Sequence, residues 1–292
     1  FMISGLDTPS TESDFTWPPS LKESISEHVG DYIIEAKHTP DTTRDPDKYL
    51  SLVLEVIETR EKTALYLLDN YELDLFNIVF TATDRAQHTL WKYMKTDHVD
   101  HVPGYEDHIF KIFERIDKAL ERILEKIGTK GDIIVMSDHG HLLGERGFIG
   151  KPTTGLYPEL LDIVYWFKMP GQEPKEIDSL VYNFDYFPTL FHLIGKEIPE
   201  QAEGENLWEL VQGKKEGFRD YITCILKNFG VVFDGSWALI IDTKGNNGRL
   251  YDVTNDPNWT KNVADQHPKE VKRLFELLKK DGGGSLPDNL PV

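Results

Sequence analysis

Two pairs of acidic and histidine residues stand out as candidates for chemistry. Asp138 and His139 directly follow an apolar run, and Asp84 and His88 lie four positions apart after another. A neighbouring carboxylate and imidazole can both bind one divalent cation, and residues four apart share a face if the chain is helical there. Each pair alone also fits an ordinary turn or a helix cap. Two such pairs after two apolar runs favour one shared site.

A glycine-rich loop follows the first pair. Gly140, Gly144, Gly147 and Gly150 fall within eleven residues, and the loop ends at Lys151. Glycine costs conformational entropy on folding, so a loop with this many glycines is either disordered or shaped for close approach to a ligand. We therefore expect Lys151 to take part in the same site.

The elements that must position these residues follow from hydrophobic periodicity. The apolar runs at residues 73–81 and 132–136 predict buried strands. The spacing of apolar residues predicts amphipathic helices over 46–70 and 109–127. Strand, helix and strand in this order form a βαβ unit, which predicts an α/β fold with a mostly parallel sheet and helices on both faces. Ligands of such sheets bind beyond the carboxyl ends of the strands, where both polar pairs fall.

The pattern of the sequence changes near residue 204, which predicts a second structural region. Short strands alternate with Gly, Asn and Asp turns and suggest a small antiparallel sheet. An amphipathic helix follows over 268–280. We expect the metal-binding part of the core over residues 1–204, a small α+β subdomain over 205–281, and a flexible tail over 282–292. The strands are expected at 221–226, 231–233, 237–242 and 249–253.

Composition and net charge limit the kinds of partner that the protein can bind. The formal net charge is −18, so the surface repels nucleic acid and anionic membranes. An anionic substrate then needs a metal or a few placed cations. Cys224 is the single cysteine, which fits a reducing compartment, and no apolar run approaches the ~18 residues of a membrane span. We expect a cytoplasmic protein that acts on a small anionic ester.

Three short segments form a motif: Ser137-Asp138-His139-Gly140, Leu143-Gly144-Glu145-Arg146-Gly147 and Gly150-Lys151. This motif resembles the metal-binding motif of sulfatases and phosphonate monoester hydrolases, in the alkaline phosphatase superfamily. The resemblance implies that Asp138 and His139 bind the active-site metal and that Lys151 contacts the charged ester group. Mn²⁺ or Zn²⁺ suits this ligand pair, and Ca²⁺ is also compatible.

The other pair resembles a different branch of that superfamily. The Asp84-to-His88 spacing looks like the Asp-x-x-x-His of nucleotide-pyrophosphatase-type phosphodiesterases, where both residues bind a second metal and a later histidine joins them. His141 is the nearest candidate for that histidine. We favour one metal, with His88 near the substrate as proton donor and Asp84 orienting it. Two metals per chain would overturn this reading.

The nucleophile of the family is not found in this chain. A Thr, Ser or Cys is implied, together with metal-binding Asp residues from a first strand, and Cys224 lies in no such motif. Asp7-Thr8-Pro9-Ser10 has the residue types but not the spacing, and an ordinary turn explains it. We expect Phe1 to lie inside a longer protein, with the nucleophile segment absent from this chain, either in a missing amino-terminal segment or on another chain that completes the site.

These observations predict a metal-dependent hydrolase of phosphate, phosphonate or sulfate esters. The Asp84/His88 spacing favours a phosphodiesterase, and the alternative within this class is a sulfatase. A third possibility, from another class, is a fragment without catalytic activity that acts only as a binding module. The oligomeric state and the alcohol portion of the substrate are not readable from the sequence.

Overall fold

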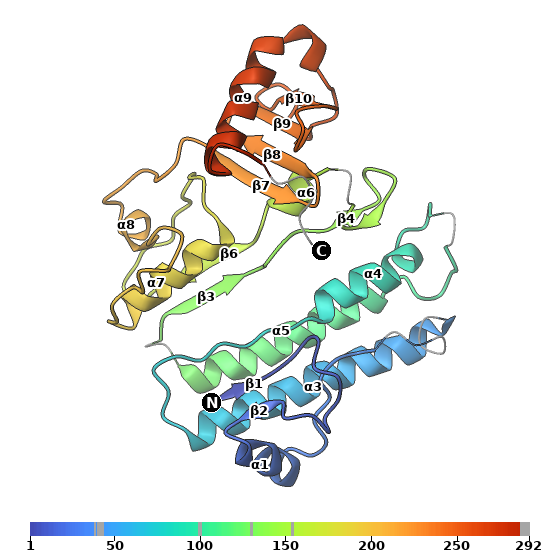
Figure 1. Cartoon of the computed structure of the whole chain (residues 1–292). Helices are drawn as coiled ribbons and strands as arrows, with labels where there is room; N and C mark the ends of the chain where they lie inside the picture. The colour runs from blue at the N-terminus through green and yellow to red at the C-terminus, as the bar shows by residue number, and fades with distance from the viewer. Residues whose placement is uncertain (38, 40–43, 99–100, 129–130, 153–154, 287–292) are drawn as a thin grey trace. The chain divides into compact units, whose positions relative to one another are not determined.

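The chain divides into two units, each with its own hydrophobic core (Figure 1). Unit 1 comprises residues 1–132 and 143–150, and unit 2 comprises residues 133–142 and 151–292. The computed structural model describes all residues except 38, 40–43, 99–100, 129–130, 153–154 and 287–292.

Unit 1 is built around three helices. The core consists of the apolar faces of α3, α4 and α5, with Tyr49, Ile57, Leu90 and Ile112 fully buried. The predicted helices over 46–70 and 109–127 are thus confirmed. Its elements are β1 (Met2–Ile3), β2 (Thr16–Trp17), α1 (Ser20–His28), α3 (Pro46–Asn70), α4 (Ala82–Met94) and α5 (His108–Ile127).

Two polar features fix the long helix α3. The Asp45 carboxylate accepts a hydrogen bond from the Lys48 amide at 3.1 Å, and Pro46 occupies the first helical position, where no amide hydrogen is needed. Midway along the helix, Glu61 is buried against Arg115 and Arg122 of α5. A carboxylate so far out of water is tolerated because the two guanidinium groups neutralise it.

Unit 2 contains the four-stranded carboxy-terminal sheet and, before it in the chain, a longer part with short helices and the two-stranded ladder β3–β6. The first strand of the unit, β3, pairs with β6 in antiparallel register, with Val135 opposite Trp166. Between β3 and β6 the chain forms the short helix α6, and η1, α7 and α8 connect this ladder to the carboxy-terminal sheet. The elements of this part are β3 (Ile133–Met136), α6 (Pro158–Leu161), β6 (Tyr165–Lys168), η1 (Asn183–Asp185), α7 (Tyr186–Leu193) and α8 (Trp208–Val211).

The carboxy-terminal sheet confirms the predicted antiparallel strands. Four strands lie in the order β10-β9-β8-β7, each antiparallel to its neighbour. Side chains alternate between two buried faces, because successive strand residues point to opposite sides. Leu274 and Leu278 of α9 cover one face, and Leu156 and Leu160 cover the other. The elements are β7 (Ile222–Leu226), β8 (Phe229–Phe233), β9 (Trp237–Asp242), β10 (Arg249–Asp252), η2 (Ala264–Gln266) and α9 (Pro268–Asp281).

The strand predicted over residues 73–81 is wrong. The segment is irregular in the structure, and Leu75 and Val79 are 43% and 63% exposed. An apolar run becomes a strand only when a neighbouring strand takes up its amide and carbonyl groups, and this run has no such neighbour among the described residues. The predicted βαβ unit with β3 therefore does not form, and β3 instead pairs antiparallel with β6.

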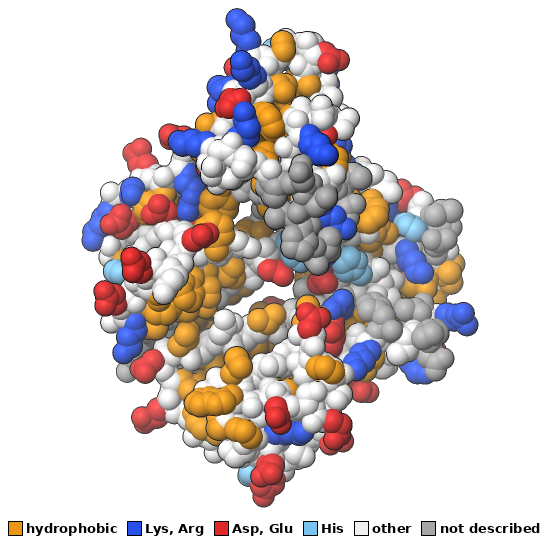
Figure 2. All heavy atoms as spheres, viewed as in Figure 1, with side chains coloured by type: hydrophobic (Ala, Val, Ile, Leu, Met, Phe, Trp, Pro, Cys, Tyr) orange, Lys and Arg blue, Asp and Glu red, His pale blue; other side chains and the backbone are white. Residues whose placement is uncertain are grey.

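The β3–β6 ladder leaves apolar side chains at the surface. Val135, Val164 and Trp166 alternate along one face and are 38%, 42% and 67% exposed. Figure 2 shows hydrophobic side chains gathered over this ladder and α7. A two-stranded ladder with apolar residues on both faces is typical of the interior of a layered α/β fold.

The domain boundaries at residues 204 and 281 stay predictions from the sequence. Part of the predicted flexible tail, residues 287–292, lies outside the described residues. Within the described part of the chain, no helix has the length and apolar character to cross a membrane.

Candidate metal and ester-binding residues

In unit 1, Asp84 and His88 lie on one face of α4, as their spacing predicts. The imidazole Nε2 is 3.5 Å from the carboxylate Oδ1, and both side chains are about a third exposed or less, at 32% and 27%. The helix thus brings the two groups together through its 3.6-residue repeat alone.

The face of α4 that carries His88 packs against the glycine-rich loop. The indole N–H of Trp91 donates a hydrogen bond to the carbonyl of Leu143 at 2.6 Å. A Cβ at Gly150 would lie 2.9 Å from the His88 ring, and the backbone there has φ +113°. Both observations require glycine at position 150. This glycine of the predicted ligand loop therefore makes room for the histidine.

Further along the same loop, a cavity of about 420 Å³ opens beside the end of α4. Lys95, His98 and Phe148 line it, and the Lys95 ammonium approaches the backbone of Gly144. The loop therefore packs along α4 from His88 to Lys95.

In unit 2, Asp138 and His139 form the turn that follows β3. The Asp138 carboxylate accepts the His139 amide hydrogen at 3.0 Å, which closes the turn on itself. The backbone passes so close to α6 that a Cβ at Gly140 would lie 2.1 Å from the Glu159 carbonyl oxygen. Only glycine fits there. The Asp138 side chain points outward and is 83% exposed.

The protonation pattern of His139 follows from its neighbours. Its Nδ1 lies 2.8 Å from the Gly140 carbonyl, which can only accept, so Nδ1 carries the hydrogen. Its Nε2 lies 3.1 Å from the Lys151 ammonium, which can only donate, so Nε2 carries a lone pair. Asp138 Oδ2 is 3.5 Å from the same nitrogen. A cationic group thus already faces the lone pair of His139 beside a carboxylate.

This donor set fits a divalent cation. A neutral imidazole with its lone pair on Nε2 and an adjacent carboxylate are the ligands that Mn²⁺, Zn²⁺ and similar ions take. The ring is oriented by the Gly140 carbonyl through its other nitrogen, as is usual for metal-binding histidines. Asp138 and His139 would hold the ion. The Lys151 ammonium would then have to move away from His139 Nε2 when the ion binds.

The sequence reasoning missed Asn183, which fixes this turn. Its side-chain amide donates to the Asp138 carbonyl at 3.0 Å. Asn183 itself is held by the next turn, where the buried Asp185 carboxylate accepts from Arg219 at 2.8 Å and from the Tyr182 amide at 2.7 Å. Asn183 lies 45 positions from Asp138, so no local pattern in the sequence could reveal the contact.

Tyr165 lies in β6, opposite Met136, the last residue of β3, and the turn follows β3. Burial, with a contribution from the charge of Asp185, raises the pKa of Tyr165 well above its ordinary value. It therefore stays a neutral phenol at any physiological pH and is no candidate for a base.

The structure brings together Asp138, His139 and Lys151 within unit 2, and Asp84 and His88 within unit 1. Their roles as metal ligands, ester-binding group and proton donor stay predictions. The shared site of the two clusters is likewise a prediction from the sequence.

Two family models match successive parts of the chain. The model described as N-sulphoglucosamine sulphohydrolase, C-terminal, matches residues 144–281. The model described as type I phosphodiesterase / nucleotide pyrophosphatase matches residues 4–146. Together the two models cover residues 4–281.

The chain is similar to the alkaline phosphatase superfamily over both of these matched parts. The resemblance seen in the motif around Asp138 and Lys151 is thereby confirmed.

Curated relatives are sulfatases. A Delta 4,5-hexuronate-2-O-sulfatase from Bacteroides thetaiotaomicron is 24% identical over 60% of this chain and 39% of its own length. A sulfatase from Formosa agariphila is 31% identical over 56% of this chain and 33% of its own length. The chain thus spans well under half the length of these relatives.

Solved structures confirm the fold class. A structure in complex with its substrate D-glucosamine-2-N,6-O-disulfate matches with a TM-score of 0.51 and 24% identity, over 63% of this chain and 41% of that chain. A 2-O GAG sulfatase matches with a TM-score of 0.52 and 19% identity, over 91% of this chain and 57% of that chain. The predicted α/β class with a carboxy-terminal antiparallel sheet agrees with these folds.

Proposed function

We propose that the protein containing this chain is a metal-dependent hydrolase of sulfate esters. The observation that carries the proposal is the arrangement of Asp138, His139 and Lys151, in which a carboxylate and an imidazole lone pair face an ammonium group. The sulfatases among the relatives support sulfur over phosphorus. The sequence-based preference for a phosphodiesterase is therefore replaced by its alternative.

Two relatives support a substrate class. One solved neighbour holds a small sulfated sugar, and a curated relative is a sulfatase of hexuronate units. We infer a sulfated saccharide as the substrate of this protein. Such a ligand is a small anionic ester, for which Lys151 supplies a placed cation on a chain of net charge −18.

Each residue has a distinct part in the proposed reaction. The Lys151 ammonium binds the charged ester oxygens and stabilises the charge that develops on them. His139 and Asp138 hold the divalent ion, which when bound acts as a Lewis acid and lowers the pKa of the attacking group. His88, with Asp84 behind it, donates a proton to the leaving oxygen.

A phosphodiester is the second candidate substrate. The match of residues 4–146 to type I phosphodiesterases and the Asp84–His88 pair on α4 favour it. In that case Asp84 and His88 would bind a second metal ion and would not serve as proton donor and orienting group.

Substrate comparison with metal counting tests both readings. We expect the whole protein, loaded with Mn²⁺, Ca²⁺ or Zn²⁺ in turn, to release sulfate from 4-nitrophenyl sulfate faster than it cleaves bis(4-nitrophenyl) phosphate. One metal per chain should be found, with chelator treatment abolishing turnover. Faster phosphodiester cleavage with two metals per chain would replace the proposal by the second candidate. No cleavage of either ester with any of the three metals would leave only the binding-module reading.

A further inference from the structure

The cavity beside the end of α4 is lined by side chains that the proposed reaction does not use. It has a volume of about 420 Å³ and lies within unit 1. Lys95 and Asp97, which follow α4, form one part of the lining, and Phe148 and Ile149 of the glycine-rich loop form another. An ammonium group, a carboxylate and an aromatic ring thus surround one hollow.

This cavity lies next to the histidine that we propose as the proton donor. A Cβ at Gly150 would lie 2.9 Å from His88 Cε1 and 3.4 Å from Phe148 Cε1. The two ring atoms are therefore no further apart than the sum of these distances, which is about the span of one sugar ring with its hydroxyl groups. Because Phe148 lines the cavity, a ring bound there can carry the oxygen that His88 protonates.

The loop that carries Phe148 is held in shape by hydrogen bonds. The Gly144 amide donates to the Phe148 carbonyl at 3.1 Å, and the Gly147 amide donates to the Gly144 carbonyl at 3.0 Å. The Trp91 indole ties the loop to α4 through the Leu143 carbonyl. The Phe148 ring is 47% exposed, so it presents an apolar surface to a ligand. A surface fixed in advance lowers the entropic cost of binding.

The two charged groups of the cavity keep their capacity for hydrogen bonds with a ligand. Lys95 Nζ lies 4.0 Å from Asp97 Oδ1, which makes an ion pair but is too long for a hydrogen bond. In the part of the chain that the structure describes, neither side chain has a hydrogen-bond partner. An ammonium that donates and a carboxylate that accepts are thus placed side by side, and their charges cancel.

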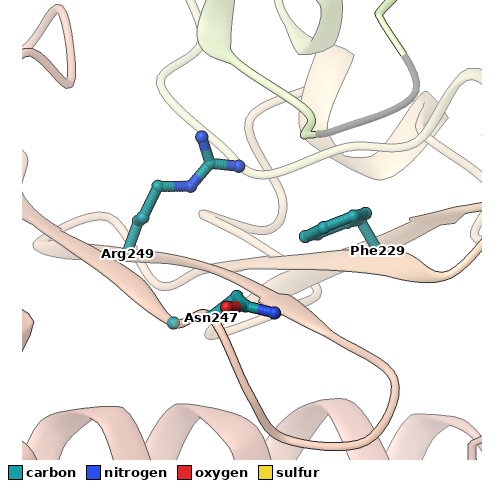
Figure 3. Close-up of a pocket in the computed structure, with 4 residues that line it drawn as sticks. Phe229, Asn247 and Arg249 are labelled. Atoms are coloured by element: carbon teal, nitrogen blue, oxygen red, sulfur yellow. The ribbon is translucent and has the colours of Figure 1, made fainter.

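The arginine of a second cavity, in unit 2, is by contrast engaged within the protein. Phe229, Asn247 and Arg249 line this cavity at the rim of the carboxy-terminal sheet (Figure 3). Arg249 Nη1 donates to the Tyr157 hydroxyl at 2.5 Å. Arg249 Nη2 lies so near the backbone that a Cβ at Gly155 would be 2.5 Å from it. The cavity beside α4 is therefore the stronger candidate for a ligand.

The lining of the cavity beside α4 matches a ring that carries hydroxyl groups. A hydroxyl both donates and accepts, so neighbouring hydroxyls suit a carboxylate next to an ammonium, and such charge-assisted hydrogen bonds are strong. The apolar face of the same ring suits Phe148. Because the charges of Lys95 and Asp97 cancel, their pair does not favour a second anionic group.

We propose that this cavity binds the alcohol portion of the ester, a polyhydroxylated ring such as a hexose. Phe148 lies against the face of the ring, and Lys95 and Asp97 bind its hydroxyl groups. The inference rests on the proposed function and makes it more specific, because it names the residues that select the alcohol whose oxygen His88 protonates.

Binding of three sulfate esters to the whole protein tests the proposal. Methyl sulfate carries the ester group alone, cyclohexylmethyl sulfate adds a ring, and glucose 6-sulfate adds a ring with hydroxyl groups. By calorimetry, both ring-bearing esters should bind about fivefold or more tightly than methyl sulfate, because the ring buries apolar area against Phe148.

Two variants separate the contributions of the lining. Phe148→Ala should abolish the advantage of both ring-bearing esters. Asp97→Ala should weaken glucose 6-sulfate alone by about tenfold, the contribution of a hydrogen bond to a charged group. Both variants should bind methyl sulfate as the wild-type protein does.

Two control variants in the same unit lie outside the cavity. Phe110→Ala removes an exposed ring of α5, and Glu114→Ala removes an exposed carboxylate that is paired with Lys118. Both should preserve all three affinities. Circular dichroism checks the folding of each variant. The Asp97 side chain is 78% exposed, so its replacement still tests the cavity if Phe148→Ala does not fold.

The inference is overturned if the three esters bind the wild-type protein equally, if none of them binds, or if Asp97→Ala or a folded Phe148→Ala binds them as the wild-type protein does. The proposed function is judged separately, by release of sulfate from 4-nitrophenyl sulfate. Release without a preference for ring-bearing esters would retain the hydrolase and remove the role of the cavity. The expected preferences without release of sulfate would retain the cavity as a binding site and remove the hydrolase.

Discussion

The two polar clusters are assembled in opposite ways. On α4, one turn of helix sets Asp84 against His88, and both belong to the same element. After β3, the turn at Asp138 and His139 depends on groups from elsewhere in the chain: a lysine twelve positions beyond His139, and an asparagine forty-five positions beyond Asp138.

The cluster after β3 is therefore more sensitive than the pair on α4 to substitutions elsewhere in the chain. A helical pair tolerates changes far away, because its geometry comes from backbone hydrogen bonds within the helix. A turn bounded by tertiary contacts changes when any of those contacts is lost.

The largest effect is expected at Lys151. In the whole protein, Lys151→Ala should lower turnover by about 10² or more, because a donor to the charge that develops on the ester oxygens is lost. Steady-state kinetics with 4-nitrophenyl sulfate measures this. Lys168→Ala, on exposed β6, serves as the charge-matched control and should leave turnover unchanged. An unchanged rate in Lys151→Ala would remove this lysine from the site.

The buried carboxylates of the two units should have similar effects on stability. Asp185→Asn in unit 2 and Glu61→Gln in unit 1 each leave arginine groups without their charge partner. Each should lower the free energy of unfolding by about 3 kcal/mol, as measured by urea denaturation. The exposed Glu203→Gln should change it by well under 1 kcal/mol. A loss confined to one unit would show that only that unit depends on its buried pair.

Asn183 should matter for metal binding but not for α4. Asn183→Ala removes the hydrogen bond to the Asp138 carbonyl, and a partner that orients a ligand typically contributes about tenfold or more in metal affinity. Titration of Mn²⁺ followed by electron paramagnetic resonance measures the change. Asn246→Ala, in the β9–β10 turn, is the matched control. Equal affinity of wild-type and Asn183→Ala would mean that the turn holds its shape without Asn183.

The smallest effect is expected in unit 1, on the free energy of unfolding at alkaline pH. Burial raises the pKa of Tyr49 above its ordinary value near 10. The unfolded chain then loses this proton first as the pH rises, so the free energy of unfolding falls from about pH 10 upward. In Tyr49→Phe that fall should be less steep, with the same slope below pH 9. Denaturation curves from pH 8 to 11.5 measure the free energy of unfolding at each pH. The exposed Tyr71→Phe serves as control. The same dependence of this free energy on pH in wild-type and Tyr49→Phe would contradict the prediction.

Much of the local structure could be predicted from the sequence. The helices α3 and α5 follow from apolar residues at helical spacing, and the four carboxy-terminal strands follow from their turn residues. The pairing of Asp84 with His88 needed only the spacing of four residues. These features depend on neighbours along the chain, which a sequence states directly.

What the sequence could not decide depends on partners far along the chain. The apolar run at 73–81 has the composition of a buried strand but no strand beside it, and composition does not specify a neighbour. The direction of β3 against β6, the contact of Asn183 with Asp138 and the place of Arg249 beside Gly155 each join residues dozens of positions apart. From the sequence alone came the candidate residues for the chemistry, the helices α3 and α5 and the carboxy-terminal strands. Which of the candidate residues meet depends on the fold, because hydrogen bonds and packing between distant segments form only when the whole chain is folded.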